Sequence, residues 1–93
     1  MNIINLQFDS TVTRLAGNPY GRKVYDEQVK DKINFEFENQ IIFPKQIINI
    51  ASSFVQGFFE EIISNVGILG VGKQIIIIAD GIDIQKVIID NLR

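Results

Sequence analysis

The chain has 93 residues, 46% of them hydrophobic, carries a formal net charge of −2 and contains no histidine, cysteine or tryptophan. This length suits one domain with one hydrophobic core, and the missing histidine and cysteine exclude a Ser-His-Asp hydrolase triad, a disulfide framework and the usual zinc ligands. Lysine and arginine are dispersed along a slightly negative chain and form no basic stripe, so we expect no nucleic-acid partner.

The first third of the chain predicts a strand, a loop and a helix. Residues 3–8 (I-I-N-L-Q-F) partly alternate between apolar and polar, which is typical of a strand with one face on the core. Residues 9–20 are rich in turn-forming side chains and lack periodicity, so they predict a loop, with or without a short strand at residues 11–15. Residues 21–33 have the apolar spacing of a helix.

The next segment predicts further extended structure. Residues 33–38 (I-N-F-E-F-E) alternate cleanly and predict a strand with one solvated face. Residues 41–43 form a short apolar run before Pro44, which restricts the preceding residue to extended conformations. Residues 46–51 lead from there into the following helix.

Residues 51–67 (A-S-S-F-V-Q-G-F-F-E-E-I-I-S-N-V-G) predict the best-defined helix in the chain. Ser53 and Gln56 have the spacing of a capping box, which sets the start at Ser53, and Gly67 is typical of a helix end. Gly57 interrupts the middle at a cost of about 1 kcal/mol relative to alanine, so either another segment packs closely against it or the position tolerates it. Two adjacent apolar rows form a broad face that must be buried, namely Phe54, Phe58 and Ile62, and Val55, Phe59, Ile63 and Val66.

The last third predicts a connector, a strand and a helix. Residues 67–73 (G-I-L-G-V-G-K) match the spacing of a phosphate-binding loop, but Gln74 stands where a serine or threonine is needed and the segment runs from helix to strand, so we interpret it as a connector. Residues 74–79 (Q-I-I-I-I-A) predict a central strand covered on both faces. Residues 82–92 predict a final amphipathic helix.

Taken together, these elements predict an α/β fold. We expect a single small domain with a mixed, largely parallel sheet and alternating helices, β-α-β-α-β-α, plus an extra hairpin or irregular segment before the second helix. Every apolar run is shorter than the roughly 20 residues that span a bilayer, and the chain opens without a signal-peptide pattern. We therefore expect a cytoplasmic protein with no membrane partner.

Two places in the sequence are candidates for function. Ser52 and Ser53 begin the helix of residues 51–67, where one hydroxyl can cap the helix and where a phosphate would also be favourable, because the helix dipole and free amides attract negative charge. Gly21 and Arg22 begin the preceding helix and are candidates for contact with an anion or a partner. The glutamate pairs 36/38 and 60/61 are interpreted as solvated surface, so we expect no catalytic residue, metal or cofactor.

The segment S-S-F-V-Q-G-F-F, which follows an isoleucine-rich approach, resembles the S-F-x-x-x-hydrophobic signature of the bacterial STAS-like family. These are small relatives of the sulfate-transporter and anti-sigma-factor-antagonist domains, and Gly21-Arg22 is also similar to that family. In anti-sigma-factor antagonists the corresponding strand-to-helix junction reads D-S-S-G-L-G, and a partner serine kinase of the histidine-kinase ATPase fold phosphorylates one of the serines. Ser52 and Ser53 match those serines, whereas Ala51 stands in place of the aspartate and Phe54 in place of the glycine.

The resemblance implies a non-enzymatic regulatory module that binds an anti-sigma-like ATPase through the amino end of this helix. Two alternatives stay open on the residues alone. One is a small-ligand or nucleotide-binding domain that uses Gly21, Arg22 and the helix amino ends as an anion site. The other is a structural subunit whose many isoleucines form a homo-oligomer interface.

Overall fold

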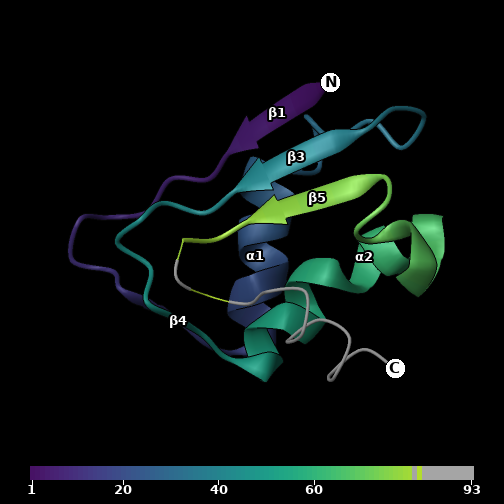
Figure 1. Cartoon of the computed structure of the whole chain (residues 1–93). Coiled ribbons are helices and arrows are strands. Elements are labelled where there is room, and N and C mark those ends of the chain that lie inside the picture. The colour runs from purple at the N-terminus through teal and green to yellow at the C-terminus, as the bar shows by residue number, and fades with distance from the viewer. Residues whose placement is uncertain (81, 83–93) are drawn as a thin grey trace.

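The computed structural model describes residues 1–80 and residue 82, which form an α/β fold of alternating strands and helices (Figure 1). The predicted fold class is therefore confirmed. The helix predicted at residues 82–92 lies outside the described residues, apart from Ile82. The described elements are β1 (Asn2–Asn5), β2 (Arg14–Leu15), α1 (Asn18–Gln28), β3 (Asn39–Ile42), β4 (Asn49–Ile50), α2 (Ser52–Gly70) and β5 (Ile75–Ile78).

The main sheet in the described part of the chain has the strand order β1-β3-β5, and both of its pairings are parallel. β2 and β4 form a second, two-stranded parallel sheet. The segment that contains β1 and β2 therefore pairs twice with the segment that contains β3 and β4. The first pairing places Asn2 opposite Asn39, and the second places Arg14 opposite Asn49. Parallel neighbours need a crossover connection, and α1 and α2 supply the two crossovers. Where the sequence predicted a mixed sheet, every described pairing is parallel.

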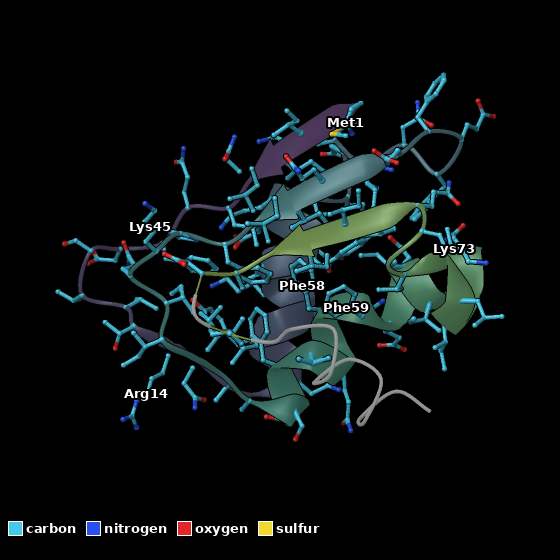
Figure 2. The ribbon with its side chains drawn as sticks, viewed as in Figure 1. Met1, Arg14, Lys45, Phe58, Phe59 and Lys73 are labelled. Atoms are coloured by element: carbon cyan, nitrogen blue, oxygen red, sulfur yellow. The ribbon has the colours of Figure 1, made fainter. Side chains whose placement is uncertain are left out.

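Both helices lie on one face of the main sheet and enclose the core with it. In Figure 1 the strands face the viewer and α1 passes behind them, and Figure 2 shows Phe58 and Phe59 in the middle of the molecule. Phe58 is the centre of an aromatic cluster in which its ring centroid lies 4.9 to 6.0 Å from those of Tyr25, Phe43, Phe54 and Phe59. The apolar rows predicted for the second helix are thus the main contribution of α2 to the core.

The two helices cross with their backbones in close contact at two glycines. A Cβ atom on Gly21 would lie 2.3 Å from the carbonyl oxygen of Phe54, and one on Gly57 would lie 2.1 Å from the carbonyl oxygen of Asn18. A Cβ atom cannot be accommodated at either distance. The close packing of the two helices therefore requires glycine at both positions, Gly21 on α1 and Gly57 on α2. The sequence left open whether Gly57 was merely tolerated, and the structure shows that α1 packs directly against it.

α1 begins and ends earlier than the predicted helix of residues 21–33. Its N-cap is Gly17, whose φ of 97° favours glycine, and Pro19 lies in the first turn, where its missing amide proton costs no hydrogen bond. The glycine, asparagine and proline that predicted a loop are therefore the start of the helix. At the other end the amides of Val29 and Lys30 both donate to the carbonyl oxygen of Tyr25, which closes the last turn.

The prediction of a strand at residues 33–38 is wrong, because this segment is an irregular loop. The alternating pattern is real, since Ile33 and Phe35 are partly buried against the core, but β1 pairs with residues 39–42 instead and leaves the loop without a neighbouring strand. The fully buried side chain of Asn39 holds the loop in place. Its amide nitrogen donates to the carbonyl oxygens of Asn34 and Phe37, at 2.6 and 2.8 Å, and its amide oxygen accepts from the backbone of Asn34.

β5 is an edge strand of the described sheet, so the prediction of a central strand covered on both faces is wrong. Only Ile75 and Ile77 are buried, and the central position belongs to β3. The connector before β5 is as predicted: Gly67 has a φ of 74° and interrupts the helix, and the chain then runs into a strand. A phosphate-binding loop needs the opposite order of strand, loop and helix.

Gly21→Ala and Gly57→Ala are each expected to destabilise the protein. Helix propensity alone favours alanine by about 1 kcal/mol, but overpacking costs about 1 to 3 kcal/mol or more, and the obstructing atoms here are backbone atoms that cannot move aside. Urea unfolding measures the free energy of unfolding, with the exposed Ser64→Ala on α2 as a control that should change it by less than about 0.5 kcal/mol. A gain in stability in either glycine variant would contradict the close contact.

Candidate functional site

Ser53 lies in the first turn of α2 but does not cap it. The helix begins at Ser52 with Ala51 as N-cap, and no side chain caps the end, so the predicted capping box of Ser53 and Gln56 is wrong. Because the helix starts one residue earlier than predicted, Ser53 already has helical geometry and its hydroxyl points toward α1. There its Oγ accepts a hydrogen bond of 2.9 Å from the backbone amide of Gly17.

Ser52 and Ser53 therefore occupy different environments. Ser52 is exposed on the first residue of α2, whereas Ser53 is half-buried and engaged with the amino end of α1. The two helix amino ends lie side by side, because α1 follows β2 and α2 follows β4, and these two short strands are paired. This end of the molecule presents two sets of free backbone amides, with no acidic side chain in the first turn of either helix.

Gly21 is buried at the contact between the helices rather than exposed at a binding site. Gly17 and Gly21 are two small residues four positions apart on one side of the contact. Ser53 and Gly57 are a second such pair, on α2. The two pairs face each other across the helix contact, through the hydrogen bond of Ser53 to Gly17 and the close approaches at Gly21 and Gly57. The structure thus brings Ser53 and Gly21 together, through a packing motif that the sequence reasoning missed although its spacing was visible in the sequence.

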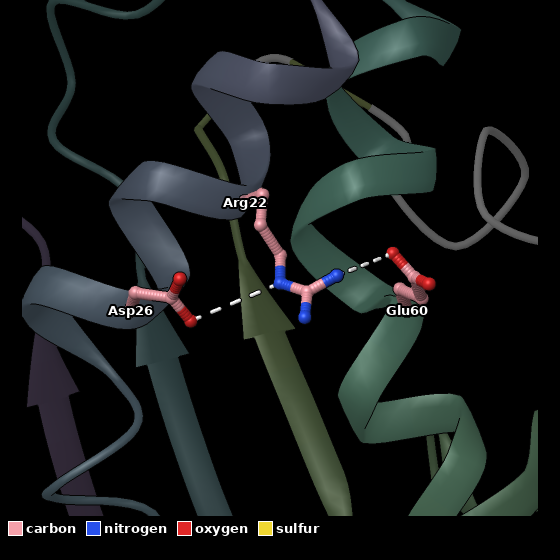
Figure 3. A network of polar contacts seen from close by, with 3 residues as sticks. All are labelled: Arg22, Asp26 and Glu60. Carbon is pink, nitrogen blue, oxygen red and sulfur yellow. Dashed lines mark hydrogen bonds and ion pairs between the residues drawn. The ribbon is translucent and has the colours of Figure 1, made fainter.

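Arg22 is held by two carboxylates on the surface of the helix pair (Figure 3). Its Nη1 lies 2.8 Å from Oε2 of Glu60 on α2, and its Nε lies 3.9 Å from Oδ1 of Asp26 one turn further along α1. About half of each of the three side chains is exposed, so each pair contributes about 1 kcal/mol at most. A shallow groove of about 230 Å³ adjoins them, lined by Arg22, Glu60, Glu61 and Ser64.

Tyr25 carries a buried hydroxyl that sequence reasoning did not single out, because the residue fitted the apolar face of a helix. The side chain is fully buried, and its hydroxyl has no hydrogen-bond partner within residues 1–80 and 82. Burial raises the pKa of Tyr25 well above its ordinary value, and the Glu61 carboxylate raises it further. The group is therefore a neutral phenol at any physiological pH and is unsuited to acid–base chemistry.

A larger open cavity of about 420 Å³ lies at the start of β1, lined by Met1, Asn2, Lys32, Asn34 and Phe37. It is at the amino ends of the strands, whereas the amino ends of both helices lie beyond the carboxyl ends of β1 and β3. In open α/β sheets ligands bind beyond the carboxyl ends, where the strand order reverses. The described order β1-β3-β5 has no such reversal, so it provides no crevice of that kind beside Ser52 or Ser53.

Two further observations concern the described part of the chain. In residues 1–80 and 82, no cluster of three or more acidic, histidine or cysteine side chains is arranged to hold a metal ion. Neither described helix combines the length and the apolar character needed to cross a membrane.

Comparisons of this chain with protein-family models, with curated proteins and with solved structures gave no match. The resemblance to the STAS-like family therefore stays a prediction from the sequence, as do the roles that it implies for Ser52, Ser53, Gly21 and Arg22.

Ser53→Ala is expected to lower the free energy of unfolding by about 1 to 2 kcal/mol, because the Gly17 amide loses its acceptor in a half-buried position. The matched control is Ser52→Ala, which removes an exposed hydroxyl and should change the free energy by less than about 0.5 kcal/mol. Hydrogen exchange at the Gly17 amide should accelerate in the Ser53 variant alone. Equal costs for the two variants, or unchanged exchange at Gly17, would show that the hydroxyl does not make this contact.

Tyr25→Phe is expected to leave stability at neutral pH unchanged or to raise it by up to about 1 kcal/mol, because the ring packing is kept and an unpaired buried hydroxyl is removed. Because the folded-state pKa of Tyr25 is raised, wild-type stability is intact below the ordinary tyrosine pKa of 10.0 and is lost as the pH rises above it. The variant should lose less stability in that alkaline range. Urea unfolding at neutral and alkaline pH measures both effects, and a loss of more than about 1 kcal/mol at neutral pH would reveal a partner for the hydroxyl.

Proposed function

We propose that this chain is a non-enzymatic regulatory module that binds another protein through the amino end of α2, as the resemblance to anti-sigma-factor antagonists implies. The observation that supports this most is the exposed Ser52 at a strand-to-helix junction, one residue after Ala51 and beside the amino end of α1. The partner class is an anti-sigma-like ATPase of the histidine-kinase fold, and we place the interaction in the cytoplasm.

The electrostatics of this surface favour a switch by negative charge. Unpaired amides and the helix dipole give a helix amino end a partial positive charge, and the first turns of α1 and α2 contain no acidic side chain. A phosphate added here gains attraction to the helix and changes the docking surface by nearly two charges. Phosphorylation would therefore be tolerated by the fold while altering what the surface binds.

The two serines have separate roles in this proposal. Ser52 is the acceptor of the phosphate, because its hydroxyl is exposed. Ser53 positions the surface, because its hydroxyl accepts the Gly17 amide and holds the two helix amino ends together. A phosphate on Ser53 would have to break that contact beside two glycines that leave no space between the helices. Modification at Ser53 would thus separate the helices, whereas modification at Ser52 leaves the fold intact.

The test is a binding and phosphorylation assay with an anti-sigma-like ATPase of the histidine-kinase fold from the same genome. We expect a complex with the unmodified chain, transfer of one phosphoryl group to Ser52 in the presence of ATP, and binding that is weaker by about tenfold or more for Ser52→Asp. Calorimetry measures the affinity and mass spectrometry of peptides locates the phosphate.

Ser64→Asp is the matched control, because Ser64 is an exposed serine of the same helix far from its amino end. It should bind as the wild type does. If the chain forms no complex with the ATPase in either state, or if the two aspartate variants bind equally well, the proposed function is wrong.

A further inference from the structure

The cavity of about 420 Å³ at the start of β1 has the size of a small-molecule site. Such sites measure roughly 300 to 1,000 Å³. Its lining comes from three places in the chain: Met1 and Asn2 at the start of β1, Lys32 in the turn after α1, and Asn34 and Phe37 in the loop of residues 33–38. Segments that are far apart in the sequence therefore converge on it.

A buried hydrogen-bond network holds the walls of this cavity. The fully buried Asn39 side chain binds the backbone of the loop on one side. On the other side its Oδ1 accepts a hydrogen bond of 2.7 Å from Nδ2 of Asn2, which also donates to the carbonyl oxygen of Lys32 at 2.5 Å. The side chain of Gln74 donates to the carbonyl oxygen of Phe35 and ties the loop to the start of β5. Because a satisfied buried network makes its surroundings rigid, the cavity is preformed.

The same hydrogen bonds decide which polar groups are left for a ligand. Both hydrogens of the Asn2 amide go to oxygen acceptors, so its Oδ1 has no donor among the described residues. The Asn34 side chain accepts from the backbone amide of Glu36 through its oxygen, and its Nδ2 has no acceptor in the same part of the chain. The Lys32 ammonium forms no ion pair with any carboxylate of residues 1–80. The lining therefore offers a cation, an amide donor and an amide acceptor.

Met1 and Phe37 supply the apolar part of the lining. The Phe37 side chain is 61% exposed, so its ring is available for another planar ring to stack on. The flexible thioether of Met1 adapts to the shape of a neighbouring ring. Lys32 is the charged side chain of the lining, and none of the five residues is acidic. The complementary ligand is therefore an anion with an apolar ring.

We propose that this cavity binds a small organic anion that carries a planar apolar ring, of which an aromatic carboxylate is the simplest case. The carboxylate pairs with the Lys32 ammonium and accepts a hydrogen bond from the Asn34 amide, while the ring lies against Phe37. Hydrogen bonds to a charged group are about twice as strong as those between neutral groups. The charge of the ligand, rather than its shape alone, therefore decides what binds.

This site is separate from the proposed regulatory surface. The amino ends of α1 and α2 lie beyond the carboxyl ends of β1 and β3, whereas the cavity lies at the start of β1. The inference is thus independent of the proposed function, and either one can fail alone. Ligand sites beyond the carboxyl ends of strands arise where the strand order reverses. Here the loop of residues 33–38 forms the hollow instead.

NMR titration of the isotope-labelled full chain with sodium benzoate tests the proposal. The cavity is open and the contacts are few, so we expect a dissociation constant of about 1 mM. The backbone amide signals of Lys32 and Asn34 and the side-chain amide signals of Asn2 and Asn34 should shift and reach saturation. Benzamide keeps the ring but is neutral, and acetate keeps the charge but has no ring. Each should bind more weakly than benzoate by about tenfold or more.

Lys32→Gln and Phe37→Ala should each weaken benzoate binding by about tenfold. Both side chains are exposed, so the fold should be kept, which the same spectra report, and either variant keeps the test valid if the other unfolds. The matched control is Lys45→Gln, which removes an exposed lysine beyond the carboxyl end of β3, away from Met1 in Figure 2. It should bind benzoate as the wild type does.

Four outcomes would overturn the proposal. The first is the absence of a saturable shift with benzoate. The second is equal binding of benzoate and benzamide, because the site would then not recognise an anion. The third is an equal loss of affinity in Lys32→Gln and Lys45→Gln, because benzoate would then bind exposed lysines in general. The fourth is a set of shifts confined to the amino ends of α1 and α2, because the anion would then lie at the other end of the strands.

Discussion

The close contact between α1 and α2 determines where most of the described chain lies. Because Gly21 and Gly57 let the two backbones touch, the helices act as one layer, and the aromatic side chains around Phe58 fill the space between that layer and the sheet. The same contact brings the two helix amino ends together, which places the paired strands β2 and β4 directly before them. A side chain at either glycine would push the two helices apart and disturb the layer against which the core packs.

The same contact between the helices also determines the surroundings of the candidate functional residues identified from the sequence. Ser53 and Gly21 are brought into one contact, where their small size serves packing, and Arg22 is neutralised by Glu60 across the same pair of helices. Ser52 is exposed and lies outside this contact. The proposed regulatory role therefore depends on the surface at the amino end of α2, whose shape is maintained by the contact between α1 and α2. A charge added at Ser52 would alter that surface without disturbing the contact between the helices.

The arrangement of helices on one side leaves the molecule with two different surfaces. The helix layer carries the charged side chains and the amino ends of both helices, whereas the open face of the sheet carries isoleucines and two amides. A partner that binds the amino end of α2 would contact the helix layer and not the strands.

The sequence by itself determined the α/β class, the apolar face of α2, the glycine break at Gly67 and the inward alternation of β1, because these follow from periodicity within one segment. It did not determine that residues 33–38 form a loop, that β5 lies at an edge, or that Ser53 contacts Gly17 instead of capping its own helix. Those outcomes depend on which segment lies alongside: β1 pairs with residues 39–42, β3 takes the centre, and α1 lies against α2. Periodicity reports which side of an element is buried, and only the tertiary structure decides which partner buries it.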